Sequence, residues 1–156
     1  MAEKTQAMRI LEGRRIPYEL HHYDASETNA EQVAVAIGAS PSEVYKTLVV
    51  QRQYGKPLLV MIRANAELDL KKLAKILGEK KIKMASHRDA ERMTGLQSGG
   101  ISALALLNRG FDIFIDNDSL KNDKITVSGG RRGIQIRLST LELISVVNAK
   151  TVDVSR

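Results

Sequence analysis

The expected fold depends on one stretch of sequence, Val44-Tyr45-Lys46-Thr47-Leu48-Val49-Val50. Its β-branched and aliphatic residues are typical of a buried β-strand, and the polar run 51–56 indicates where that strand ends. Because successive side chains of a strand point to opposite faces, both faces here are largely apolar. The strand is therefore expected at the centre of a sheet, with Lys46 as a charged residue that an apolar environment does not favour.

Lys46 has more than one explanation. Its aliphatic stem can cover apolar surface while the ammonium group reaches water at the end of the strand. The ammonium group can instead pair with an acid, or face a cleft that receives an anionic ligand. The strand by itself does not separate these alternatives.

The composition is that of an ordinary globular protein, since 43% of the 156 residues are hydrophobic and 27% are charged. A chain of this length is expected to form a single domain over residues 1–156. The absence of cysteine excludes disulfides, thiol catalysis, iron–sulfur clusters and cysteine-ligated zinc. No apolar run approaches the ~20 residues of a membrane span, and the N-terminus lacks a signal-peptide core. We therefore expect a cytoplasmic protein without a membrane partner.

The charge balance favours a polyanionic partner, because the formal net charge is +6 and the pI is near 9.7. Aromatic residues make up only 4% of the chain, so a platform that stacks a row of bases is not expected. If RNA binds, it should do so through its phosphates and a terminal nucleotide. For each short basic cluster, such as 80–83 or 131–132, a solvated surface is the favoured explanation.

Local patterns predict a mixture of helices and strands without strict alternation. Helices are expected over 3–13, from the capping box of Thr28 and Glu31 to Gly38, over 70–77 after Asp69, over 87–94 after Ser86, and over 141–147 after Ser139. Strands are expected over 18–23, 44–50, 57–63, 111–115, 124–128 and 133–138, with an edge strand at 152–154. The apolar residues 103–107 fit a strand or a helix. The expected class is α/β (α+β), with a mixed, mostly antiparallel sheet surrounded by helices.

Standard catalytic motifs are absent from the sequence. His21 and His22 would point to opposite faces of a strand, and no metalloprotease, nucleophile-elbow or P-loop pattern occurs. Without cysteine or a histidine cluster, neither a metal nor another cofactor is expected. Nothing in the spacing indicates a Ser/His/Asp triad.

Two paired-glycine loops are the remaining candidates for chemistry, 98–102 and 128–133. Glycine lets the backbone approach a ligand and point N–H groups at a phosphate or at a developing oxyanion. For Gly129 and Gly130, the sequence by itself favours a simple hairpin turn.

Five motifs appear in order and together resemble one family. They are Glu27-Thr28-Asn29, the Lys46 strand, Leu68-Asp69-Leu70-Lys71-Lys72-Leu73-Ala74-Lys75, Gly99-Gly100-Ile101-Ser102 and Val127-Ser128-Gly129-Gly130-Arg131-Arg132-Gly133. With these motifs the chain resembles the YbaK/EbsC family of aminoacyl-tRNA deacylases, which are similar to the editing domain of bacterial prolyl-tRNA synthetase. The resemblance spans about residues 5–155.

The resemblance implies a compact domain of that fold and a trans-editing hydrolase that cleaves the ester of mischarged aminoacyl-tRNA. The substrate it implies is Cys-tRNA(Pro), with Cys-tRNA(Cys), Ala-tRNA(Pro) or another aminoacyl-tRNA as alternatives. The implied partners are the tRNA 3′ end that carries the amino acid and prolyl-tRNA synthetase. In some members the thiol of the substrate cysteine is thought to attack the ester, so that no enzyme nucleophile is needed.

The resemblance also assigns site residues. The essential lysine of the family falls on Lys46, which would contact the tRNA 3′ end and help position the ester. The substrate-binding positions it implies are Tyr23, Asn29, Thr47, Gly99, Gly100, Ile101, Ser102, Ser128 and Gly129.

Four positions depart from the family pattern near the expected pocket. Ala30 replaces a common aromatic residue, Ala103 and Ala105 replace a proline and a glycine, and Gln135 replaces a common aspartate. Such changes leave the fold alone but affect which amino acid is accepted, since one methylene in a pocket shifts selectivity by ~1–3 kcal/mol. They also leave open a non-catalytic regulator of the same fold that binds aminoacyl-tRNA or a nucleotide.

Overall fold

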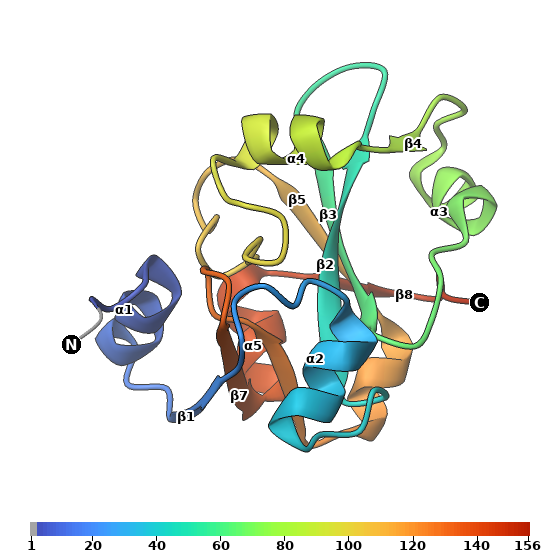
Figure 1. The fold of residues 1–156 in the computed structure, drawn as a ribbon. Coiled ribbons are helices and arrows are strands. Elements are labelled where there is room, and N and C mark those ends of the chain that lie inside the picture. The colour runs from blue at the N-terminus through green and yellow to red at the C-terminus, as the bar shows by residue number, and fades with distance from the viewer. Residues whose placement is uncertain (1–2) are drawn as a thin grey trace.

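The structure, a computed structural model, describes residues 3–156 as an eight-stranded mixed sheet with helices on both of its faces (Figure 1). The strands run in the order β1-β7-β6-β2-β3-β5-β8, and β4 pairs with β2 outside this path. Their bounds are β1 Tyr18–His22, β2 Val44–Gln51, β3 Leu58–Arg63, β4 Lys83–Met84, β5 Asp112–Asp116, β6 Lys124–Ser128, β7 Ile134–Ser139 and β8 Lys150–Val152.

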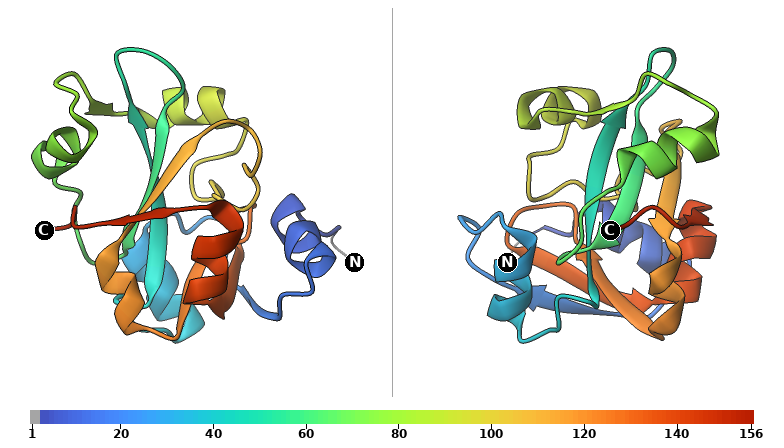
Figure 2. Two further views of the ribbon diagram at one scale, coloured as in Figure 1. Left: turned by 180° about the vertical axis from the view of Figure 1, so that it is seen from behind. Right: turned by 90° about the vertical axis from the view of Figure 1, so that its right-hand side faces the viewer.

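The helices are short and lie on different sides of the sheet. Their bounds are α1 Gln6–Gly13, α2 Ala30–Ile37, α3 Leu70–Leu77, α4 His87–Thr94 and α5 Thr140–Val147, with a 3-10 helix at Asn117–Lys121. In Figure 1, α2 lies in front of the lower part of the sheet and α5 lies behind it, and the view from behind in Figure 2 exchanges them.

The central position of β2 is confirmed. It pairs antiparallel with β3 over residues 45–50 and parallel with β6 at Val44 and Tyr45. Within the described residues, four strand pairings are antiparallel and three are parallel, which confirms a mixed sheet in which antiparallel pairs are the larger share.

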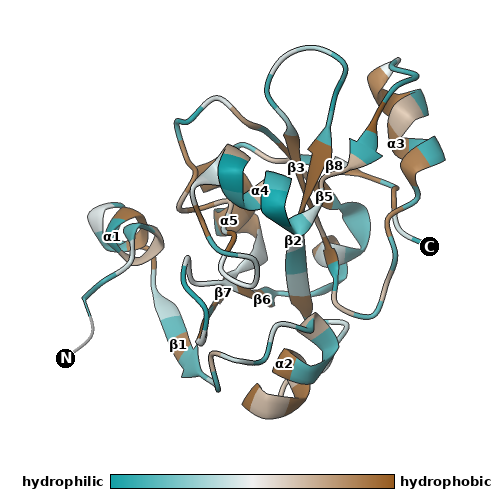
Figure 3. Ribbon diagram, turned by 45° about the horizontal axis from the view of Figure 1, so that its top comes forward, coloured by the Kyte–Doolittle hydropathy of each residue, from teal (hydrophilic) through white to brown (hydrophobic). Residues whose placement is uncertain are grey.

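Apolar side chains fill both faces of the sheet, as the alternation in β2 predicts. On one face Tyr45 and Val49 join a large cluster that includes residues of α1 and α5, whereas Val50 joins Leu73 of α3 on the other face. Figure 3 shows hydrophobic residues along β3, in contrast with the hydrophilic helix α4.

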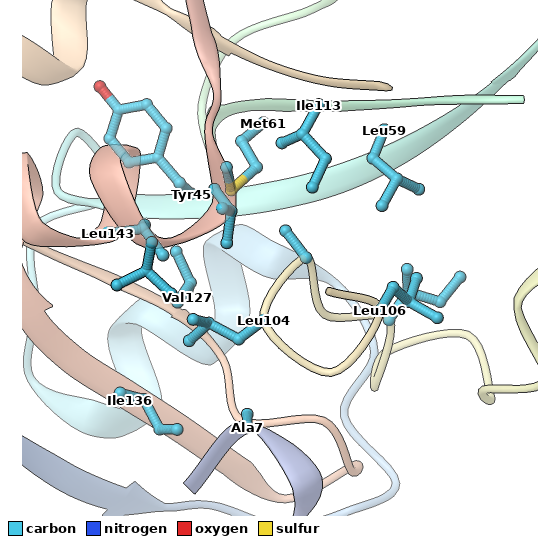
Figure 4. Packing of buried hydrophobic residues seen from close by; sticks show 14 of the residues in the cluster. Ala7, Tyr45, Leu59, Met61, Leu104, Leu106, Ile113, Val127, Ile136 and Leu143 are labelled. Carbon is cyan, nitrogen blue, oxygen red and sulfur yellow. The ribbon is translucent and has the colours of Figure 1, made fainter. Parts of the chain in front are cut away.

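Residues 103–107 form turns, so both predicted alternatives, strand and helix, are wrong. Leu104 and Leu106 are nevertheless fully buried, and Figure 4 shows them pointing at the same cluster as Val127 and Leu143. Burial without a regular hydrogen-bond pattern leaves no periodicity in the sequence, which explains why the segment could not be assigned.

Three of the predicted helix caps are correct, and the predicted cap of α2 is shifted by one residue. The side chains of Asp69, Ser86 and Ser139 each accept a hydrogen bond from a backbone N–H three residues later, as predicted. The cap of α2 is Asn29 and not Thr28, because the side-chain oxygen Oδ1 of Asn29 accepts a hydrogen bond from Gln32 N at 3.1 Å. Asparagine is at least as good a cap as threonine, so the one-residue shift has a local cause.

Several other elements begin or end one residue away from the expectation, and the larger differences are in α1 and the last strand. Helix α1 starts after the cap residue Thr5 instead of at residue 3. Gly13 is its last helical residue rather than its cap, and Arg15 takes the left-handed conformation with φ 58°. The last strand lies at Lys150–Val152, two residues earlier than predicted.

Candidate active site

The neighbour of β2 changes along one of its edges, and this leaves a gap in the sheet. Strand β6 pairs with Val44 and Tyr45, whereas β4 pairs with Val50 and Gln51. Between these two contacts, residues 46–48 have no strand beside them on that edge among the described residues. The backbone of an unpaired strand edge can bond to a ligand, so the gap is a natural place for a site.

A cavity of about 510 Å³ opens at this gap. Its walls come from β2, from the segment that leads into α2, from the start of α4, from the loop after α4, and from β6 and β7. The lining residues are Tyr23, Thr28, Asn29, Ala30, Glu31, Val33, Val44, Tyr45, Lys46, Thr47, Leu48, Val49, Ala64, Met84, Ala85, His87, Ala90, Ser98, Gly99, Ile101, Ser128 and Gln135.

Lys46 is half-buried in the wall of this cavity rather than extended into water at a strand end. Its Nζ donates a hydrogen bond to the Ala64 carbonyl oxygen at 3.2 Å. Burial lowers the pKa of the Lys46 ammonium, and the nearby carboxylates of Glu31 and Glu67 act in the opposite direction. No ion pair within residues 3–156 includes Lys46, so its other donors are available to an anionic ligand.

Buried polar atoms without a hydrogen-bond partner concentrate at the same cavity. Of the four such side-chain atoms in the described part of the chain, three belong to lining residues: Thr47 Oγ1, Ser98 Oγ and Gln135 Oε1. Leaving a buried polar atom unpaired costs ~1–3 kcal/mol, and a protein tolerates that where a ligand completes the bonds. The cavity is therefore suited to a polar ligand.

Seven of the predicted site residues line the cavity together. They are Tyr23, Asn29, Lys46, Thr47, Gly99, Ile101 and Ser128. They come from four separate parts of the sequence, and the fold alone brings them to one place.

Gly100, Ser102 and Gly129 do not line the cavity but support the loops around it. A Cβ at Gly100 would lie 3.0 Å from Arg132 N, so this position lets the two glycine loops touch. The Ser102 hydroxyl is buried and accepts from Ala105 N at 3.1 Å. A Cβ at Gly129 would lie 2.6 Å from Ile134 Cγ2, closer than carbon atoms approach.

Several contacts that shape the site join segments that no sequence motif pairs with one another. Ser98 is held in place because its carbonyl oxygen accepts from Arg132 Nε at 2.5 Å and its N–H donates to Glu91 Oε2 at 2.8 Å. Glu31 and His87 also line the cavity, and no sequence motif indicates that these two residues lie near the same site. These contacts join segments far apart in the chain, and spacing cannot predict them.

Two of the four departures from the family pattern reach the cavity. Ala30 and Gln135 line it, whereas Ala103 is buried elsewhere and Ala105 packs close to Gly130. Changes in ligand selectivity are therefore to be sought at positions 30 and 135.

A second cavity of about 510 Å³ lies at the end of the β2–β3 hairpin, between residues such as Arg52, Pro57 and Met93. Its size matches the first, but no unpaired buried atom of the described residues belongs to its lining. Residues 3–156 hold no group of three or more acidic or histidine side chains placed to bind a metal ion. None of their helices is long and apolar enough to cross a membrane.

Comparison with known proteins points to one kind of domain. Residues 24–146 match the family model described as an aminoacyl-tRNA editing domain. The chain is 35% identical over 155 residues to EbsC of Enterococcus faecalis, named as a candidate Cys-tRNA(Pro)/Cys-tRNA(Cys) deacylase, covering 98% of this chain and 94% of that one. It is also 34% identical over 77 residues to the proline–tRNA ligase of Thermodesulfovibrio yellowstonii, covering 49% of this chain and 13% of the ligase.

A solved structure shares the fold. The crystal structure of a candidate trans-editing enzyme for prolyl-tRNA synthetase superposes with a TM-score of 0.83 at 24% identity, covering 99% of each chain.

Proposed function

The chain belongs to the aminoacyl-tRNA editing domain family, and we propose that its substrate is Cys-tRNA(Pro), with Cys-tRNA(Cys) as a second substrate. Hydrolysis of aminoacyl-tRNA is the activity of the protein, whereas the amino acid and the tRNA are our proposal. The relative named for these two substrates supports it, because the likeness covers 98% of the chain.

The observation that carries the proposal is Lys46, a half-buried ammonium group inside the cavity without an acidic partner among the described residues. The last nucleotides of tRNA carry phosphates, and a positive group in a partly desolvated wall attracts them strongly. We assign Lys46 to binding the tRNA 3′ end, so that the ester lies over the gap beside β2. Tyr23, Asn29, Thr47, Gly99, Ile101 and Ser128 would surround the terminal adenosine and its amino acid.

Cleavage then needs a nucleophile at the ester carbonyl. In the route we favour, the thiol sulfur of the substrate cysteine attacks the carbonyl carbon, the bond to the tRNA oxygen breaks, and that oxygen takes the thiol proton. Water then opens the resulting thiolactone. A cysteine thiol has a pKa near ~8.5, so a reactive fraction exists at neutral pH without help from a triad.

The remaining partners follow from the same proposal. The substrate is delivered as a charged tRNA 3′ end, and prolyl-tRNA synthetase is the enzyme whose errors would be corrected. The reaction belongs in the cytoplasm, where translation consumes aminoacyl-tRNA. A positive net charge of +6 suits a partner whose backbone carries one phosphate per nucleotide.

A deacylation panel tests the proposal. Cys-, Ala-, Pro- and Ser-tRNA(Pro) and Cys-tRNA(Cys) are incubated with the wild type, with Lys46→Ala, and with Lys71→Ala as a control on the exposed side of α3. We expect Cys-tRNA(Pro) to be lost fastest, and Lys46→Ala to slow its loss at least about tenfold, the value of one charge-assisted hydrogen bond. Lys71→Ala should match the wild type.

Faster loss of Ala-tRNA(Pro) than of either cysteinyl ester would replace cysteine by alanine as the substrate. Wild-type rates in Lys46→Ala would remove the role that we give to this lysine.

A further inference from the structure

The backbone of Thr47 points into the gap beside β2. The carbonyl oxygen of Val44 accepts from Ala64 N at 2.7 Å, toward β3, and residues two apart on a strand direct their backbone groups to the same side. Val44, Lys46 and Leu48 therefore bond to the β3 side. The carbonyl oxygen of Val49 accepts from Ala85 N at 2.9 Å on the other side, so the N–H and C=O of Thr47 also point there.

Strand β6 leaves a carbonyl group in the same gap. Thr126 N donates to Glu43 O at 2.9 Å, so the backbone groups of Thr126 and Ser128 point toward β2. The parallel ladder stops at Tyr45 and Val127, one residue before the Thr47 N–H would reach the Ser128 carbonyl oxygen. Within residues 3–156 this carbonyl oxygen has no partner on β2.

Gln135 adds a side-chain acceptor next to this carbonyl group. It is paired with Ser128 in the antiparallel register of β6 and β7, and cross-strand partners point their side chains to the same face. Gln135 is buried, with a residue exposure of 6%, and its Oε1 has no hydrogen-bond partner within residues 3–156. Both Ser128 and Gln135 line the cavity.

Acceptors are therefore available at this gap. They are the backbone carbonyl oxygens of Thr47 and Ser128 and the unpaired Gln135 Oε1 of the cavity lining, beside the donors of the Thr47 N–H and the Gln135 amide. A primary ammonium group carries three donors and no acceptor, which matches these acceptors. Lys46 does not occupy it, because its Nζ is turned to the Ala64 carbonyl oxygen.

We propose that the gap between β2 and β6 binds the free α-ammonium group of the aminoacyl moiety, with Gln135 as a residue that determines specificity for it. The inference rests on the proposed function, since it assigns part of the same substrate to part of the same cavity. It implies that the protein acts on aminoacyl-tRNA and spares tRNA whose amino group is acylated, as in peptidyl-tRNA.

Substrate analogues test the proposal without altering the protein. Three tRNA minihelices carry a residue on a 3′-amide linkage that resists hydrolysis: alanyl with a free amine, lactyl with a hydroxyl group in its place, and N-acetylalanyl. We expect the alanyl form to bind wild type at least about tenfold more tightly than the lactyl form, since hydrogen bonds to a charged group are the stronger ones. The N-acetyl form should bind more weakly still.

Gln135→Met then tests the residue, because methionine has a similar length and no amide. In Gln135→Met, the ratio of the binding affinities for the alanyl and lactyl forms should shrink to a few-fold. The unfolding transition of the variant verifies that it is folded. A preference that stays at the wild-type value removes Gln135 from the inference. Equal binding of the alanyl and lactyl forms by the wild type overturns the inference as a whole.

The same experiment separates the inference from the proposed function. If the protein prefers the free amine but cleaves no ester, the proposed deacylation of cysteinyl-tRNA is rejected and the proposed ammonium site is retained. If the protein cleaves the ester rapidly but binds the amine and hydroxyl forms equally, the deacylation is retained and the ammonium site is rejected.

Discussion

The hydroxyl group of Thr47 lines the cavity and is buried without a hydrogen-bond partner among residues 3–156. Replacing threonine by valine therefore removes an unpaired polar atom and keeps the β-branched shape. We expect Thr47→Val to leave the free energy of unfolding unchanged or raise it by up to about 1 kcal/mol. The rate of deacylation should fall about tenfold, because the ligand loses a buried hydrogen bond.

Thr47→Ser is the matched control, since it keeps the hydroxyl group and loses only a methyl group. Denaturant unfolding and single-turnover deacylation are measured for both variants. A clear loss of stability in Thr47→Val with normal activity would mean that the hydroxyl group serves the folded protein instead.

Some residues of the candidate site can be recognised from local sequence patterns and others cannot. Lys46 stands out because a charge in an apolar strand contradicts its surroundings, and this contrast is visible without a structure. Thr47 and Ser98 do not stand out, since threonine in a strand and serine in a loop are what these elements ordinarily contain. Their unpaired oxygens become apparent only from three-dimensional contacts.

At the scale of the element, Asn29 has two possible roles that substitutions can separate. Its side chain caps α2 by accepting from Gln32 N, and it also lines the cavity. Asn29→Ala should lower the free energy of unfolding by about 1 kcal/mol, whereas Asn29→Asp should keep the cap and the stability. Both variants are compared by thermal unfolding and by deacylation rate.

The deacylation rates of the two variants then decide the role of Asn29. If Asn29 only orders the helix, Asn29→Asp retains the wild-type rate. If its amide contacts the substrate, the aspartate variant is stable but slow, since its carboxylate repels the phosphates of the tRNA 3′ end.

Gly129 packs tightly against Ile134, although the family resemblance implies a substrate-binding role for it. The Ile134 Cγ2 atom occupies the space that a Cβ would need, at 2.6 Å, and Ile134 O also accepts from Gly129 N. We expect Gly129→Ala to lower the free energy of unfolding by about 1–3 kcal/mol, the usual cost of overpacking. Chemical denaturation measures the loss.

A second substitution provides the check. Ile134→Leu moves the branch point away from Cβ and so removes Cγ2, and the double variant should recover part of the lost stability. If the two losses simply add, the contact with Ile134 is not the cause.

Whole elements were predictable where their signals are local. The caps at Asp69, Ser86 and Ser139 depend on a side chain and a backbone N–H three residues away, and all three were recognised in the sequence. The gap beside β2 depends on the register of β6 and β4, whose partners lie far along the chain. No local pattern carries that information, so the most important feature of the site could not be predicted.

On the scale of the whole molecule, one carboxylate joins the C-terminal segment to the sheet. Asp116, at the end of β5, is buried, and its Oδ1 accepts from Val154 N at 2.8 Å and from Ser155 N at 2.9 Å. The carbonyl oxygen of Val154 accepts in turn from Asp69 N, the residue that caps α3. Asp116 thus links three parts of the chain, and it is not among the residues that line the cavity beside β2.

The carboxylate of Asp116 should contribute to the loss of stability at acidic pH. Burial acts to raise the pKa of Asp116, but the N–H donors of Val154, Asp118 and Ser155 outweigh burial and lower it below its usual value of 3.8. A carboxyl group whose pKa is lower in the folded protein adds stability above the unfolded pKa, and this contribution is lost as the pH falls through the folded pKa. The expected loss begins near pH 3.8 and continues below it.

Asp116→Asn removes the charge and places an NH₂ group where an acceptor is needed. At pH 7 the variant should unfold with a free energy about 1–3 kcal/mol lower than the wild type, the cost of an unsatisfied buried group. The difference should narrow as the pH falls below about 3.8, because the unfolded wild-type chain then binds a proton that the folded carboxylate binds only at lower pH. Urea unfolding from pH 7 to pH 3 measures it, with Asp123→Asn as an exposed control. A difference that stays constant over this range would mean that the charge of Asp116 is not what holds the C-terminal segment to the sheet.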